Sequence, residues 1–345
     1  MPAKKWIFWL KVLAFVLVIG FVGYKLYDYW QQISLSELHD ALTIDWRWGP
    51  VSMLGFMGVM LTSALGWVFI ARRMGDQAPV LPLLGAYCFS QMGKYVPGKV
   101  MLLVMRVERS SRLGMPQRIC TLSTLLENVA YMISGAIFGG AILAKILAGR
   151  GDIQGGLLLT AVGLSCVALL VVAHPKVFYR LVNPVLRKMK RPEVEPSQRL
   201  RMRWLLLSII LMVPCWVCGG VALWATTRCL VPIDLIHVWG LMGAFALSVI
   251  GGMVSFLPGG LGPREAVQAL FLMPVVMTAL PADNDTKAKA AIIVTVVVIL
   301  QRLFQIVIEL LLGLAGGLFC TITARRMAQG TAVAAATDPV PVTKV

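Results

Sequence analysis

Phe256-Leu257-Pro258-Gly259-Gly260 interrupts one long apolar segment of the chain, and Tyr95-Val96-Pro97-Gly98-Lys99 interrupts another. Proline removes a backbone donor and glycine loosens φ, so a helix normally ends at such a pair. Backbone groups left free in hydrocarbon cost several kcal/mol each, so a break survives there only when it is buried in protein or lines a cavity. The two matching breaks therefore predict a duplicated membrane core.

The composition is that of an integral membrane protein. Of the 345 residues, 58% are hydrophobic and 14% charged, and the mean hydropathy is +0.80. The net charge of +16 comes from basic residues clustered in short loops beside apolar segments, which is what membrane orientation requires. We therefore expect no nucleic-acid partner. The three histidines are scattered and the cysteines fall mostly inside apolar segments, so we expect no metal site and no cofactor.

Apolar length and loop charge predict an all-α polytopic fold with both termini in the cytoplasm. Lys4, Lys5 and Lys11 place the N-terminus on the inner side, and Arg325-Arg326 follow the last apolar segment. The expected full spans are residues 6–27, 48–70, 117–148, 155–173, 204–227 and 287–323.

Each Pro-Gly break is expected to form a re-entrant helical hairpin. The 32 residues between Arg73 and Arg106 are too few for two crossings, and both flanks are basic, so this segment enters and leaves from the cytoplasm. Residues 236–257 enter from the outer face. After Glu265 too little apolar sequence remains before Pro281 for a full crossing, so a second hairpin is expected there.

The chain is predicted to form one domain, residues 1–327, followed by a disordered cytoplasmic tail at 328–345. Residues 48–148 and 204–323 form the two halves of an inverted-topology repeat. A connector at 174–203, with nine Lys/Arg against two glutamates, joins them on the cytoplasmic side. In such repeats the binding site lies at the repeat interface near the bilayer midplane.

Ionisable residues inside apolar segments are costly and are therefore candidates for function. Those near the two breaks are Lys94, Lys99, Arg106, Glu127, Arg264, Glu265, Arg302 and Glu309. One interpretation is structural: each cation pairs with a carboxylate and fastens a hairpin to a helix, and we favour this for Glu108, Glu127 and Glu309. For four cations we favour an anion site, because cations outnumber the carboxylates around the breaks; these are Lys94, Lys99, Arg106 and Arg264. A phosphate headgroup is the natural anion in a membrane. No residue is assigned a catalytic role.

Two motifs resemble a known family. KYVPGKVMLLVMRVERSSRLG at 94–114 followed by Glu127, and SFLPGGLGPREAVQALF at 255–271 followed by Arg302, are similar to the lysylphosphatidylglycerol synthase transmembrane-region family, also called flippase-like domain proteins. The resemblance covers residues 10–325. By the family's pattern the positions that carry over are Pro97, Gly98, Lys99, Arg106, Glu127, Pro258, Gly259, Gly260, Gly262, Arg264, Glu265 and Arg302.

The resemblance implies a bacterial inner-membrane protein that moves an anionic lipid, such as an aminoacyl-phospholipid or a polyprenyl-phosphate-linked glycan, between leaflets. Full lipid-aminoacylating members carry a soluble transferase domain after the membrane part, and this chain ends soon after its last apolar segment. Synthase activity is therefore not expected. The alternatives are a membrane-embedded enzyme or an accessory subunit of lipid-linked glycan assembly or phospholipid modification. A glycosyltransferase, a lipid-modifying enzyme and a second copy of the chain are candidate partners beside the surrounding lipids.

Overall fold

The computed structural model describes residues 44–95, 100–148, 174–188, 199–255, 260, 262–282 and 285–337, with scattered positions between 156 and 171. These residues form helices and connecting turns, and no strand occurs among them. The predicted first span, residues 6–27, and most of the predicted span at 155–173 lie outside this set. The elements in chain order are η1 Trp46–Trp48, α3 Gly49–Arg73, α4 Val80–Gln91, η2 Met92–Tyr95, α5 Val100–Ser111, α6 Gln117–Ala148, α8 Pro175–Lys188, α9 Met202–Leu211, α10 Val213–Arg228, η4 Leu235–His237, α11 Val238–Val254, α12 Pro263–Ala279 and α13 Thr286–Thr337.

Five stretches in the described part of the chain are long and apolar enough to cross a membrane. They are Trp46–Arg73, Gln117–Ile146, Met202–Arg228, Leu235–Val254 and Thr286–Gln329. Three of them contain the predicted spans at 48–70, 204–227 and 287–323, and Gln117–Ile146 covers all but the last two residues of the predicted span at 117–148, so these helices are confirmed. The remaining stretch, Leu235–Val254, was predicted to be one arm of a hairpin, and its length and composition also suit a full crossing.

Helices end and begin on either side of both Pro-Gly pairs. η2 ends at Tyr95 and α5 begins at Val100, while α11 ends at Val254 and α12 begins at Pro263. In each case the second helix packs back against the first. Pro97, Gly98, Lys99, Pro258 and Gly259 themselves lie outside the described residues.

Backbone contacts in the second broken segment require glycine. Gly260 has a φ of +71°, and a Cβ atom there would lie 2.8 Å from Cα of Gly252 on α11. Gly262 has a φ of +91° and immediately precedes α12. Both positions adopt backbone conformations that residues with a side chain rarely adopt. The predicted roles of these two glycines in the turn agree with this geometry.

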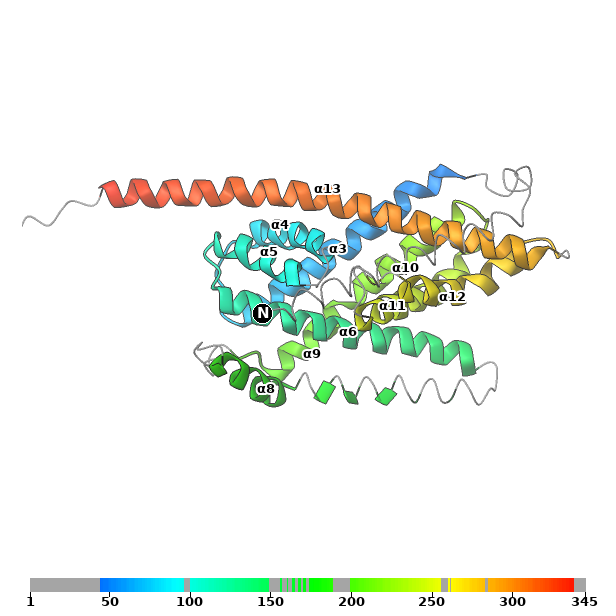
Figure 1. Cartoon of the computed structure of the whole chain (residues 1–345), viewed down its shortest axis with the longest axis horizontal. Helices are drawn as coiled ribbons and strands as arrows, with labels where there is room; N and C mark the ends of the chain where they lie inside the picture. The colour runs from blue at the N-terminus through cyan, green and yellow to red at the C-terminus, as the bar shows by residue number, and fades with distance from the viewer. Residues whose placement is uncertain are drawn as a thin grey trace, which may run out of the picture.

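The two helix pairs occupy different ends of the elongated bundle (Figure 1). Helices α4 and α5 lie in its left half and α11 and α12 in its right half. Helix α3 runs antiparallel to α9 and α10: the backbone N–H of Asp45 donates to the carbonyl of Cys229 at 2.7 Å, while the guanidinium of Arg73 lies 3.7 Å from the ring centre of Trp204. Helix α13 passes along the whole bundle and contacts both pairs.

Side-chain burial divides the helices into an interior and a surface suited to lipid. Trp67 belongs to one buried apolar cluster and Trp216 to a second, and both rings are fully buried. On α13, by contrast, Leu303, Leu311 and Leu314 each expose more than half of their surface. A long exposed row of leucines is unfavourable in water and favourable in a bilayer. The helix surface therefore agrees with a multi-pass membrane protein.

Two features outside the core differ from the sequence prediction or add to it. Helix α13 continues to Thr337, whereas a disordered tail was predicted from Ala328. The alanine-rich sequence Ala332-Val333-Ala334-Ala335-Ala336 explains the difference, because alanine has the highest helix propensity. In the basic connector, α8 is held by Tyr179, whose hydroxyl oxygen accepts from the backbone N–H of Leu200 at 2.9 Å.

Candidate functional site

A cavity of about 350 Å³ lies between two helix pairs. The first broken segment consists of α4, η2 and α5, and the second consists of α11 and α12. From the first, Tyr87, Gln91, Lys94, Leu102 and Arg106 line it. From the second come Val249, Gly252, Met253, Gly260 and Arg264, and the remaining lining residues belong to the long helices: Phe56, Val59, Met60, Ser63, Glu127, Asn128, Tyr131, Gln305 and Glu309, together with Phe245 of α11. The structure thus brings the helices that flank the two breaks, far apart in sequence, to one cavity.

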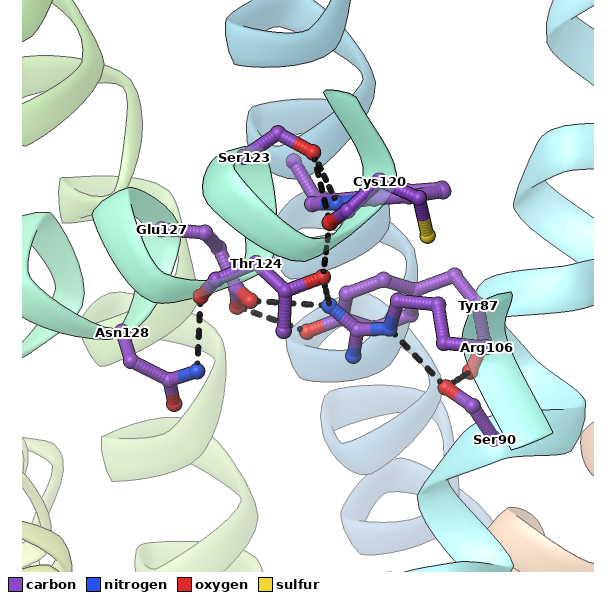
Figure 2. A network of polar contacts seen from close by, with 9 residues as sticks. Tyr87, Ser90, Arg106, Cys120, Ser123, Thr124, Glu127 and Asn128 are labelled. Atoms are coloured by element: carbon purple, nitrogen blue, oxygen red, sulfur yellow. Dashed lines mark hydrogen bonds and ion pairs between the residues drawn. The ribbon is translucent and has the colours of Figure 1, made fainter. Parts of the chain in front are cut away.

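Arg106 and Glu127 form a buried ion pair on one wall of this cavity (Figure 2). Nη1 of Arg106 lies 2.9 Å from Oε2 of Glu127, and their side chains are 1% and 6% exposed. Nε of Arg106 donates to Oγ of Ser90 at 3.0 Å, and the hydroxyl of Tyr87 donates to Oε1 of Glu127 at 3.1 Å. The guanidinium also lies 4.1 Å from the ring centre of Tyr87. The charge of each partner is therefore compensated, and α5 is fastened to α6.

A second ion pair fastens the end of the first broken segment to α13. Nζ of Lys94 lies 2.5 Å from Oε1 of Glu309. The hydroxyl of Tyr95 donates to Oε2 of Glu309 at 2.6 Å, and Nε2 of Gln305 donates to Oε1 at 2.6 Å. Glu309 therefore accepts from three donors. Lys94 and Tyr95 are the last described residues before the Pro97-Gly98 pair.

A third pair joins the second broken segment to α13 and lies outside the cavity lining. Nη2 of Arg302 lies 2.5 Å from Oε1 of Glu265. Oε2 of the same carboxylate accepts from the backbone N–H of Gly262 at 2.6 Å, which satisfies a free donor at the start of α12. Glu265 and Arg302 were predicted as ligand-binding residues. In the structure they hold the turn and fasten α12 to α13.

Arg264 is the candidate cation that carries a buried charge without a carboxylate partner in the described part of the chain. Its side chain lines the cavity and the residue is 6% exposed. Nε and Nη2 are buried and have no hydrogen-bond partner among the described residues. The guanidinium lies 5.2 Å from the ring centre of Phe245, a cation–π contact that compensates the charge only in part. Buried charges are normally paired, so Arg264 is the lining residue whose charge the described residues leave uncompensated.

The charges of the described lining residues agree with an anion site. Lys94, Arg106 and Arg264 are three cations, and Glu127 and Glu309 are two carboxylates. One positive charge is in excess, and it is the charge of Arg264. Lys99, also predicted here, lies outside the described residues. Among the described residues no cluster of three or more His, Cys, Asp or Glu side chains could hold a metal ion.

Sequence reasoning missed the neutral polar residues of the cavity. Tyr87, Tyr131, Gln91 and Asn128 contribute hydroxyl and amide groups to its wall. Asn128 follows the predicted Glu127, and Gln91 lies one helical turn before Lys94, so proximity to a predicted site residue was the available signal. The two tyrosines offered no such signal, because aromatic residues in apolar helices are mostly core residues.

The comparison with protein families agrees with these motifs. The family model described as lysylphosphatidylglycerol synthase TM region matches residues 8–282, about four fifths of the chain. No curated protein matches the sequence. The match includes both Pro-Gly segments, Arg106, Glu127 and Arg264, and it ends before Arg302 and Glu309. The chain belongs to the lysylphosphatidylglycerol synthase transmembrane-region family.

Proposed function

We propose that this protein is a flippase-like transporter that binds the phosphate of an anionic lipid at Arg264 and moves the lipid between leaflets. The observation that carries the proposal is the buried guanidinium of Arg264, which has no ion-pair partner among the described residues and lies beside a cavity lined by both broken segments. A guanidinium binds phosphate with two parallel N–H donors, and Nε and Nη2 of Arg264 are the edge suited to this. The phosphate supplies the missing counter-charge.

The size of the cavity suits a headgroup rather than a whole lipid. A volume of about 350 Å³ is at the small end of ligand pockets and holds a phosphate with a small substituent. Val100, Met101 and Val104 on α5 and Val254 at the end of α11 are exposed apolar residues close to the lining residues in sequence. In this proposal the acyl or prenyl chains stay in the bilayer along these side chains while the headgroup crosses.

The proposed movement uses the two broken segments as alternating gates. Each is a re-entrant hairpin, entered from the opposite membrane face, and the repeat halves are related by inverted topology. Lys94 is fastened to α13 through Glu309, and Glu265 fastens α12 to the same helix through Arg302. Both gates contact the same long helix, α13. A shift of either broken segment along α13 would therefore change access to the cavity. This is the usual alternating-access arrangement of inverted repeats.

A transporter fits the carboxylates better than an enzyme does. The two glutamates that line the cavity, Glu127 and Glu309, each accept from a cation and at least one further donor. In each carboxylate both oxygens are occupied by these donors, which leaves neither placed to take a proton from a substrate. We further propose a bacterial inner-membrane location with both termini in the cytoplasm. The basic connector, with exposed Lys176 and Arg180 on α8, would then contact the anionic inner leaflet.

The test is lipid exchange between leaflets by the purified chain in proteoliposomes. Fluorescent phospholipids and a polyprenyl phosphate-linked sugar serve as substrates, and quenching from outside reports the exchange rate. Arg264→Gln is expected to lower the rate by about tenfold or more, since it removes the counter-charge of the bound phosphate. Arg112→Gln is the matched control, because Arg112 is an exposed arginine paired with Glu108 outside the cavity. Equal exchange rates for wild type and Arg264→Gln with every lipid would refute the proposal.

A further inference from the structure

The ion pairs around the cavity determine how much negative charge a ligand can bring before the cavity is neutral. Arg106 is compensated by Glu127 and Lys94 by Glu309, with N···O distances of 2.9 and 2.5 Å. Arg264 alone among the described lining residues lacks such a partner. The described cavity can therefore accept one negative charge and become neutral.

Among the described lining residues, a second negative charge finds no counter-ion unless one of the two ion pairs breaks. Arg106 is 1% exposed and held by Ser90 and Thr124 as well as Glu127, so its release would leave a buried carboxylate alone. Lys94 is 24% exposed and is the more accessible of the two, yet its release would free Glu309, which is buried. If Arg106 or Lys94 pairs with the second charge of a dianion, its own glutamate is left uncompensated. The second charge therefore adds little binding free energy.

We infer that the cavity selects a lipid whose phosphate is a diester with a single negative charge, and discriminates against phosphate monoesters and diphosphates. This inference rests on the proposed function. The selected class contains both glycerophospholipid headgroups and prenyl-phosphate-linked sugars, which are diesters. It leaves out prenyl monophosphates, phosphatidic acid in its dianionic form, and diphosphate-linked carriers.

The experiment measures binding to the full chain in maltoside micelles, which contain no phosphate. Dioctanoyl phosphatidylmethanol is the diester probe and dioctanoyl phosphatidic acid at pH 8.5 is the dianionic probe, so the acyl chains are identical. Binding is followed by tryptophan fluorescence, since the ring of Trp216 lies 4.4 Å from that of the lining residue Tyr131. We expect the dissociation constant of the diester to be lower by about tenfold or more. Dimethyl phosphate, a soluble diester, is expected not to compete. Competition by dimethyl phosphate at the concentration of the lipid would overturn the assignment to a lipid.

Neutralising one cavity carboxylate should shift the preference toward the dianion. Glu309→Gln keeps the side-chain shape and leaves Lys94 without its counter-ion, so phosphatidic acid is expected to bind about tenfold more tightly than to wild type. Glu127→Gln, which frees Arg106, is the second variant and serves if the first does not fold. Glu108→Gln removes a carboxylate that is 53% exposed and outside the cavity, and is expected to change neither constant.

The outcomes separate this inference from the proposed function. If Arg264→Gln abolishes binding of both lipids while wild type binds them equally, the anion site stands and the charge selection is wrong. If Arg264→Gln binds both lipids as wild type does, the proposed function itself fails. Selection is also overturned if Glu309→Gln and Glu127→Gln fold and leave the ratio of the two dissociation constants unchanged.

Discussion

The buried pair of Arg106 and Glu127 gives the sharpest stability prediction. The change is Glu127→Gln, which removes the negative charge and keeps the shape of the side chain. The guanidinium of Arg106 then loses a partner at 2.9 Å while remaining 1% exposed. Breaking a buried ion pair by removing one partner typically costs about 3–5 kcal/mol, because the other charge is left uncompensated.

Two features of the site place the cost toward the lower end of that range. Arg106 keeps its hydrogen bond to Ser90 at 3.0 Å and its stacking on the ring of Tyr87 at 4.1 Å. We therefore expect a loss of about 3 kcal/mol, which for a chain of this size lowers the melting temperature by roughly 6 °C.

The assay is thermal unfolding in maltoside micelles followed by tryptophan fluorescence. The double variant Arg106→Met with Glu127→Gln removes both charges and is expected to recover most of the lost melting temperature, since no buried charge is left alone. Glu108→Gln, at an exposed pair with Arg112, is the control and should change the free energy of unfolding by less than about 1 kcal/mol. The reasoning is refuted if Glu127→Gln melts like wild type, or if the double variant is as unstable as the two single variants together.

Three further predictions concern the turn before α12, the loop between α3 and α4, and the connector. Gly260→Ala places a Cβ atom 2.8 Å from a backbone atom of α11 at a φ of +71°, so lipid exchange should fall. Gly251→Ala should retain exchange, because its Cβ atom would lie 3.6 Å from the side chain of Val267, an ordinary van der Waals distance. Burial raises the pKa of Asp76, in the loop between α3 and α4, above 3.8. Its contribution to stability is therefore present at low pH and lost as the pH rises through the raised pKa. Melting curves should accordingly show Asp76→Asn gaining stability relative to wild type from pH 4 to 7. Tyr179→Phe leaves the buried N–H of Leu200 without its acceptor and should destabilise the chain by about 1–3 kcal/mol, measured by the same melting assay.

The membrane helices could be predicted because they depend on local properties of the sequence. Apolar length and basic flanks place the helices at 48–70 and 117–148 within a few residues of their observed ends. The helix predicted at 287–323 begins at Thr286 as expected but continues to Thr337. The predicted span at 204–227 contains a helix break that length alone does not show, since α9 ends at Leu211 and α10 begins at Val213, just before Pro214.

The candidate residues could be predicted as a set, but not their individual roles. Glu309 and Lys94 are 215 residues apart, and no feature of the sequence shows that these two residues pair rather than Glu309 and Arg264. Arg264 and Glu265 are adjacent in sequence, yet one faces the cavity and the other caps α12. Which cation is left without a partner is a property of the three-dimensional packing of both broken segments against α13.

The most direct test of the central claim is to locate a bound lipid phosphate. A lipid with a photoreactive group beside its phosphate is crosslinked to the full chain in proteoliposomes, and the modified peptides are identified by mass spectrometry. Crosslinks are expected on both broken segments, at residues such as Leu102 and Met253 of the cavity wall, and they should disappear in Arg264→Gln. Crosslinks confined to the exposed leucines of α13, such as Leu311 and Leu314, and unchanged in Arg264→Gln would contradict a phosphate site between the two segments.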